Sequence, residues 1–172
     1  MGVTAERLKL MKGTRGVYNN HWFEVKQIDK NEMFYLVRNL EGFEQDEAIK
    51  VGLRLAGNVF KAGGKRRLRA RMKSGSQGVT GNLLRSFRVR TKRSKLGVLV
   101  GFRQGQKGGG SHAHLVDRGT DRRYWKTKGR KDVGSVKSNM FWSDTEREDY
   151  PQAMEKLYIG IEKAVNRISS RR

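Results

Sequence analysis

The chain has 172 residues and a formal net charge of +21, and 35% of its residues are hydrophobic. This length can bury one core of ordinary size, and so positive a charge predicts attraction to polyanions such as nucleic acid, anionic surfaces or acidic proteins. The absence of cysteine excludes disulfides, thiol nucleophiles and cysteine-ligated metals, and fits a reducing cytoplasm. No apolar run approaches a membrane span, and the charged N-terminus gives no sign of a signal peptide.

Residues 1–43 are weakly patterned, and we interpret them as an N-terminal arm or peripheral hairpin. Apolar residues that can form a short strand occur at Val17, Trp22, Phe23, Val25 and Ile28. From Glu44 the pattern becomes helical, with Ala48, Val51, Leu55, Val59 and Ala62 three or four residues apart. This predicts one long amphipathic helix over residues 44–73. Gly63-Gly64 is expected either to bend it or to let another backbone approach closely.

A turn and a small sheet are predicted next. Thr80 is the expected N-cap of a short helical turn, and Gly81 lets the chain turn sharply into it. Leu83, Leu84 and Phe87 are expected to pack the sheet onto the long helix. The period then changes to two, which predicts a β-hairpin with strands near 87–91 and 98–102. A third strand is predicted from His112 to Val116.

The C-terminal third is predicted to hold a basic loop and a helix. The loop covers residues 121–132 and carries Tyr124 and Trp125. Ser143 to Glu146 has the form of a capping box, and Pro151 suits the first turn of the last helix. The expected fold is therefore α+β, with a long amphipathic helix on a small antiparallel sheet, a C-terminal helix and an extended N-terminal arm. Residues 44–172 are expected to form the folded domain.

Charge is distributed unevenly along the chain. Residues 51–116 contain no aspartate or glutamate, whereas acids gather at 41–47 and 144–149. The long helix ends in a basic run of Lys65, Arg66, Arg67, Arg69 and Arg71. This run either meets acidic patches on neighbouring copies or contacts phosphates. The second basic set is Arg122, Arg123, Lys126 and Lys128, around two aromatic residues that anchor a protein interface or stack on bases. Protein contact is the favoured interpretation of both.

Four consecutive features resemble the head–tail joining and tail-completion (neck) proteins of tailed phages. They are the helix ending in a basic run, the turn from Thr80 to Phe87, the strand pair ending at Phe102, and the segment from His114 through Asp117, Gly119 and Thr120. Asn139 to Trp142 followed by a helix also fits, and the resemblance covers roughly residues 44–168. Two departures from the family pattern are Asp117, where glutamate is more common, and Val79, where a proline often precedes the Thr-Gly pair.

The resemblance implies a structural virion protein without enzymatic activity, assembled in the bacterial host cytoplasm. It implies a homo-oligomeric ring, expected to be a hexamer, at the neck or at the top of the tail as a terminator of the tail tube. Its expected neighbours are the connector and tail-tube proteins, and genomic DNA passes through the lumen with possible transient, non-specific contact.

Residue chemistry favours neither catalysis nor a bound cofactor or metal. His112, His114 and Asp117 are one conceivable metal set, but we favour exposed strand histidines because a third good ligand is not evident. Asp117 is expected to fix the turn at Gly119-Thr120 by accepting hydrogen bonds, or else to be a solvated acid. The glycines at 108–110 lack the Gly-Lys-Ser/Thr of a phosphate loop.

The rival function is a basic nucleic-acid-binding protein, although no motif of the usual binding modules is present. A nuclease has little support, since residues 51–116 supply no carboxylates.

Overall fold

A computed structural model describes residues 23–25, 35–72, 81–92, 96–104, 109–125, 129 and 132–171. Thr80, Lys126, Lys128 and most of the expected N-terminal arm lie outside these residues. No helix in the described part is both long enough and apolar enough to span a membrane.

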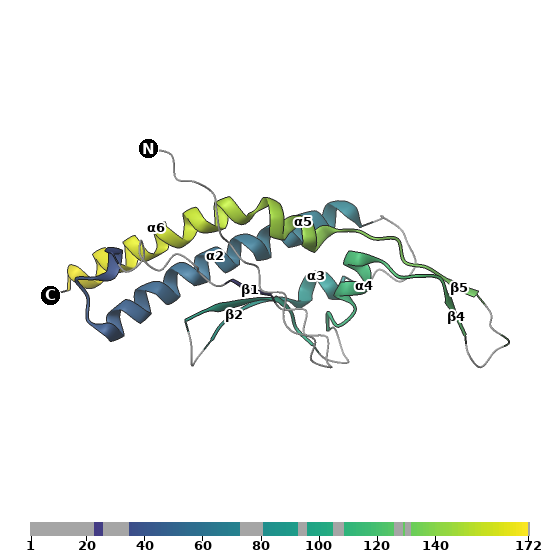
Figure 1. The fold of residues 1–172 in the computed structure, drawn as a ribbon, viewed down its shortest axis with the longest axis horizontal. Helices are drawn as coiled ribbons and strands as arrows, with labels where there is room; N and C mark the ends of the chain where they lie inside the picture. Colours follow the sequence, from purple (N-terminus) through teal and green to yellow (C-terminus); the bar gives the residue numbers. More distant parts are fainter. Residues whose placement is uncertain are drawn as a thin grey trace.

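Two long helices form the spine of the molecule (Figure 1). They are α2 (Gly42–Arg71) and α6 (Tyr150–Ser169), which pack side by side along most of their length. The helices meet at Gly52 and Gly160, where a Cβ on Gly160 would lie 2.7 Å from the Cα of Gly52. Only glycine permits so close a backbone approach. The predicted long helix is thus confirmed, two residues earlier than expected at each end.

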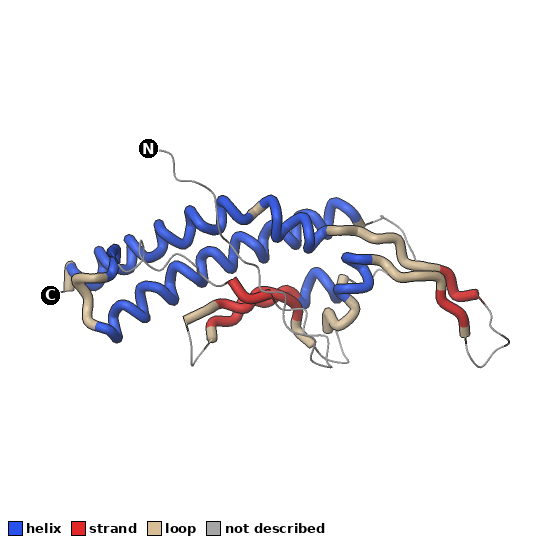
Figure 2. Tube along the Cα trace, in the orientation of Figure 1, coloured by secondary structure: helices blue, strands red, loops and turns tan. Residues whose placement is uncertain are grey.

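A three-stranded antiparallel sheet covers the side of α2 away from α6 (Figure 2). Its strands are β1 (Phe23–Val25), β2 (Phe87–Thr91) and β3 (Val98–Phe102), in the order β1-β3-β2. The predicted hairpin of β2 and β3 is confirmed, with Val89 opposite Val100. The third strand was predicted from residues 112–116, and this was wrong. The N-terminal segment supplies it, with Phe23 opposite Val100.

Residues 113–116 lie instead in a short helix, α4 (Ala113–Arg118), and His112 is its N-cap. Ala113 and Asp117, one helical turn apart, are its two buried residues, so the buried positions repeat with helical rather than strand spacing. Gly119 ends this helix with φ of 79°, a conformation that favours glycine. The expectation that Gly119-Thr120 ends a strand is corrected accordingly.

The C-terminal region contains a hairpin and two helices rather than one loop and one helix. The hairpin strands are β4 (Arg123–Tyr124) and β5 (Asp132–Gly134). The helices are α5 (Phe141–Glu148), which precedes α6, and α6 itself, which has Pro151 in its first turn as predicted. The capping box predicted at Ser143 was wrong, because α5 already begins at Phe141.

The core has two parts. The larger lies between α2, α6 and the sheet, and it includes Val37 and Leu40, which precede α2. The smaller lies under the basic end of α2 and brings together Leu68, Leu83, Phe87, Phe102, Ala113 and Phe141. Phe87 is fully buried, with its ring centroid 4.5 Å from that of Phe102. The short helix α3 (Asn82–Ser86) and the start of β2 therefore join the sheet to α2, as predicted for Leu83, Leu84 and Phe87.

Tyr150, at the start of α6, makes stability sensitive to alkaline pH. Its hydroxyl is buried without a hydrogen-bond partner among the described residues, and burial raises its pKa from 10.0 to about 12. Unfolded chains release this proton near pH 10 while the folded protein keeps it, so stability is lost as pH rises from 10 to 12. Tyr150→Phe should lack this loss, which a comparison of urea unfolding of both proteins at pH 9 and pH 12 will measure.

Candidate functional site

The basic run at the end of α2 has one face that is neutralised within the chain. Arg67 binds Asp149 with Nη1 to Oδ2 at 2.6 Å and Glu148 with Nη2 to Oε2 at 2.8 Å. The Arg67 and Asp149 side chains are only 12% and 7% exposed. Asp149 raises the pKa of Arg67, and Arg67 in turn lowers the pKa of Glu148. Arg67, predicted to face a neighbour or DNA, therefore faces its own α5–α6 junction.

Two more residues of the basic run meet acids from the 144–149 group. Arg71 binds Asp144 at 2.7 Å and donates to the backbone oxygen of Asn139. Arg66 is 70% exposed and lies 3.6 Å from the Asp149 carboxylate. The acids of this group are thus used inside the subunit, whereas the sequence favoured their use between subunits.

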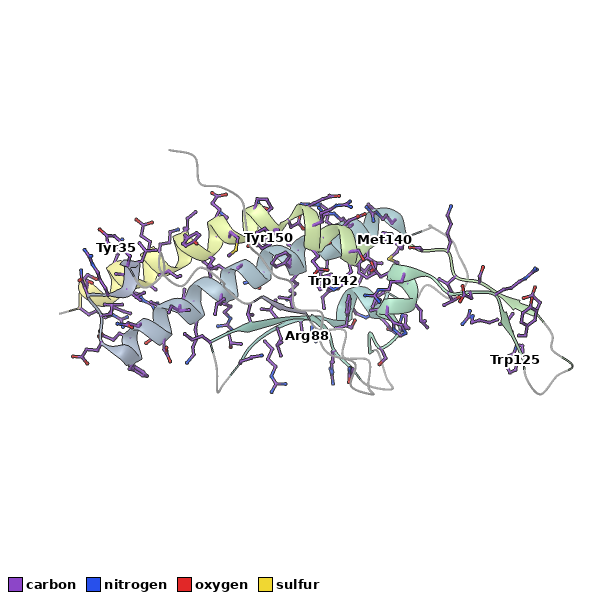
Figure 3. All side chains as sticks on the ribbon, viewed as in Figure 1. Tyr35, Arg88, Trp125, Met140, Trp142 and Tyr150 are labelled. Carbon is purple, nitrogen blue, oxygen red and sulfur yellow. The ribbon has the colours of Figure 1, made fainter. Side chains whose placement is uncertain are left out.

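Gly63 and Gly64 make this pairing possible. A Cβ on Gly63 would collide with the carboxylate of Asp149, and one on Gly64 would lie 2.8 Å from the rings of Phe87 and Trp142. The glycine pair was expected to bend α2 or admit another backbone. Instead α2 continues through it, and side chains make the close approach. Figure 3 shows Trp142 between the helices and the sheet.

A second face of the run carries cations with no acidic partner among the described residues. Lys61, Lys65 and Arg69 follow one another at four-residue spacing on α2, and Arg88 on β2 lies close enough to act on Lys65. The pKa of Lys65 is lowered, first by burial and then by these three cations. We call Lys61, Lys65, Arg69 and Arg88 the cation cluster. Arg88 is labelled in Figure 3 on the sheet side of the molecule.

The turn from Gly81 to Phe87 is a structural element. The N-cap of α3 is Gly81, with φ of 69°, and not Thr80 as expected. The Gly81 carbonyl accepts a hydrogen bond from the Arg85 amide, so the sharp turn predicted at this glycine is confirmed. Ser86 Oγ donates to the Leu83 carbonyl, and the Ser86 carbonyl accepts from the Arg103 amide. These bonds fix the start of β2 against the end of β3.

Asp117 connects α4 to α5. Its Oδ1 accepts a hydrogen bond from the Trp142 amide at 2.6 Å, and its Oδ2 accepts one from Ser143 Oγ at 2.7 Å. Its side chain is therefore the cap of α5, which agrees with the expected hydrogen-bond acceptor but not with a strand-end turn. The Asp117 carbonyl also accepts from the amides of Asn139 and Met140.

Gly119 and Thr120 anchor the hairpin that follows. Thr120 exchanges two hydrogen bonds with Val136, one through its amide and one through Oγ1. A Cβ on Gly119 would lie 2.7 Å from the Val136 carbonyl oxygen, so only glycine lets these two segments approach. Residues 117–120 and 136–140 together form the base of the β4–β5 hairpin.

The β4–β5 hairpin extends away from the body of the molecule, at the end opposite the C-terminus (Figures 1 and 2). Arg122 binds Asp132 at 2.7 Å across its base. Tyr124, Trp125 and Val133 are 53%, 51% and 45% exposed, and Arg123 is also exposed. Figure 3 shows Trp125 at this extended end. A two-stranded hairpin alone is only marginally stable in water, so these aromatic residues suit contact with another molecule.

Removal of the Asp117 carboxylate should weaken the junction between α4 and α5. Asp117→Ala is expected to cost about 2 kcal/mol of unfolding free energy, since a helix cap and a buried acceptor are lost together. Asp121→Ala removes the same charge from an exposed position four residues later and should change stability by less than about 0.5 kcal/mol. Urea unfolding followed by circular dichroism compares the two. Equal losses would contradict the capping role.

The sequence interpretation missed several residues that belong to this site or are paired beside it. Lys61 and Arg88 were not grouped with the basic run, and the internal role of the acids at 144–149 was not foreseen. The absence of any acid at i±4 from Lys61, Lys65 and Arg69 was the available signal.

His112 and His114 lie at the start of α4, not on a strand, and His114 Nδ1 is 3.1 Å from the Ser111 carbonyl. No group of three potential metal-ligating residues occurs within the described ranges.

Comparison with protein-family models, curated proteins and solved structures gives no significant match for this chain.

Proposed function

We propose that this protein is a structural adaptor of a tailed-phage particle, a subunit that assembles into a ring at the neck or at the top of the tail. The observation that carries the proposal is the extended β4–β5 hairpin, a basic and aromatic arm anchored by one of the motifs that resemble neck proteins. Adjacent rings above and below are the connector and tail-tube proteins. A hexamer with a DNA-filled lumen is the expected arrangement.

The two ends of the molecule differ in a way that suits head-to-tail assembly. The hairpin extends from one end, and the other end exposes Phe43 and Tyr35 to 81% and 63%. Four acids lie within four residues of Phe43 in the sequence, near the start of α2: Glu41, Glu44, Asp46 and Glu47. An arm that docks on the far end of the next copy makes a heterologous interface, which closes into a ring when the rotation between copies permits.

The arrangement of the resembling motifs also supports this proposal. The turn at Gly81 and the segment at Asp117 both adjoin the smaller core, under the basic end of α2. The Gly81 turn fixes the start of β2 against the end of β3, and the Asp117 segment forms part of the base of the arm. Residues of this kind hold the elements around an interface in place.

Assembly is the property to measure. Sedimentation velocity and negative-stain microscopy of the purified protein, alone and with detached tails, should detect rings or ring-capped tails. Tyr124→Ser/Trp125→Ser should abolish them without loss of helical circular dichroism. Leu55→Ser/Leu96→Ser removes two apolar residues of lower exposure outside the arm and should leave assembly intact. A wild-type protein that stays monomeric in both settings would contradict the proposal.

The second candidate is a basic nucleic-acid-binding protein without enzymatic activity. The observation that favours it is the cation cluster, whose charges no described acid neutralises. A monomer that binds DNA with steep salt dependence and is absent from phage particles would support this candidate over the adaptor.

A further inference from the structure

We infer that the cation cluster of Lys61, Lys65, Arg69 and Arg88 contacts the phosphodiester backbone of duplex DNA, while the opposite face of the same basic run serves only the fold. This inference rests on the proposed function, because the DNA is then the genome that passes through the ring. The face that carries the cation cluster is then the one directed at the lumen of the ring.

The helix period separates the two faces. Residues four apart on an α-helix lie on the same side, so Lys61, Lys65 and Arg69 form one stripe. Arg67 follows Lys65 by two residues, which places it about 200° around the helix axis. Arg67 and Arg71, one turn apart, bind the acids of α5 and of the α5–α6 junction. The basic run is therefore divided into a neutralised face and an unneutralised one.

An acidic neighbour is a poor candidate for the unneutralised face. The acids at 144–149 that a sister copy would offer are already bound, Asp149 and Glu148 by Arg67 and Asp144 by Arg71 and Arg147. Asp117 caps α5, and Asp132 binds Arg122. Near the start of α2, Glu44 accepts a hydrogen bond from the Glu41 amide and Glu47 lies 3.8 Å from Arg167 of its own chain. Asp121, Glu155 and Glu162 are exposed acids elsewhere, but the net charge of the chain is +21. The subunit thus presents more exposed cations than its own copies can neutralise.

Like charges held together favour an anionic ligand. Burial lowers the pKa of Lys65, and the charges of Lys61, Arg88 and Arg69 lower it further, so the cations of the cluster repel one another. Bound phosphates would relieve this repulsion. A row of cations at four-residue spacing on a helix rises about 6 Å per step, so the side chains of the row can reach different phosphates of the DNA backbone. Contact of this kind reads no base sequence, which suits DNA that slides past a fixed ring.

Salt-dependent binding to DNA tests the inference. The full-length protein is titrated onto a 30-base-pair duplex of mixed sequence, with fluorescence anisotropy read at several NaCl concentrations. Lys61→Gln/Lys65→Gln/Arg69→Gln should reduce the slope of log K against log salt by about 2.7 and the affinity at 0.15 M salt by roughly 100-fold. Arg88→Gln alone should reduce the slope by about 0.9. Glutamine keeps helix propensity, and circular dichroism checks that each variant is folded.

The matched control removes the same charge elsewhere. Lys156→Gln/Lys163→Gln/Arg171→Gln takes three exposed cations from α6 and its C-terminal end, and its slope should fall by less than about 1. Equal losses in the two triple variants would overturn the inference, because diffuse charge would then explain binding. Competition by polyglutamate as effective as that by duplex DNA would also overturn it, in favour of an acidic protein partner.

The same preparations separate this inference from the proposed function. If the cluster variants form rings but bind DNA as tightly as the wild type does, the role of the cluster in DNA binding is refuted and the adaptor proposal is unaffected. If the wild-type protein binds DNA through the cluster but never forms a ring or enters a particle, the adaptor proposal is refuted. The bound DNA is then not a genome that passes through a ring.

Discussion

Arg67→Met is expected to lower the free energy of unfolding by about 3 kcal/mol, because it leaves a buried carboxylate without its cation. Asp149 is 7% exposed and receives two hydrogen bonds from the Arg67 guanidinium, at 2.6 and 2.8 Å. Methionine fills much of the same volume, so lost packing contributes little. Urea unfolding at pH 7 measures the change.

The adjacent residue provides the control. Arg66→Met removes the same charge from a side chain that is 70% exposed and only 3.6 Å from Asp149. Exposed ion pairs contribute little, so we expect less than about 1 kcal/mol. Similar losses in the two variants would contradict the assignment of Arg67 as the buried partner of Asp149.

The Arg67 pairing also has a pH signature. Arg67 holds the pKa of Glu148 below its ordinary 4.5 in the folded protein. This stabilisation is fully present above pH 4.5 and is lost as pH falls through the lower pKa of the folded state. The stability difference between wild type and Arg67→Met should therefore narrow under acidic conditions.

Gly52→Leu is expected to cost about 3 kcal/mol or more, because the two spine helices cannot separate to admit a side chain without loss of the core between them. A Cβ at this position would lie 2.5 Å from the Leu157 carbonyl oxygen and 2.7 Å from Cγ1 of Ile161. Backbone contacts of this kind cannot be relieved by a rotamer change. Thermal unfolding followed at 222 nm should show a much lower midpoint.

Gly42 is the matched position at the start of the same helix. A Cβ there meets nothing within 4 Å. Gly42→Leu should therefore leave stability unchanged or raise it by up to about 1 kcal/mol through helix propensity. If both leucine variants unfold at the wild-type midpoint, the close packing of α2 on α6 is wrong.

Elements defined by their own periodicity could be predicted from the sequence. In α2 the buried side includes Ile49, Leu53 and Phe60, whereas Leu55 and Ala62 of the predicted stripe are exposed. The alternation of β2 and β3 correctly indicates which side is buried, and the long helix and the hairpin occur where expected. The α+β architecture followed from them. Local turn chemistry was equally informative at Gly81, where a positive φ matches the predicted turn.

Features that depend on distant partners could not be predicted in this way. Residues 112–116 alternate like a strand, but they form a helix because Asp117 caps α5 and Gly119 ends α4. The partner strand of β3 came from residues 23–25, far earlier in the chain. The basic run looked uniform because the sequence does not reveal that Asp149 is held against Gly63. The division between structural and exposed cations emerged only from the fold.

The central claim is that this protein is part of the neck of a tailed-phage particle. The most direct test is to delete its gene from the genome of origin and to examine any particles that this genome produces by cryo-electron microscopy and mass spectrometry. We predict separate DNA-filled heads and tails, restored to joined particles by the wild-type protein, with the protein detected as a ring at the junction. Intact, infectious particles formed without this protein would contradict the account.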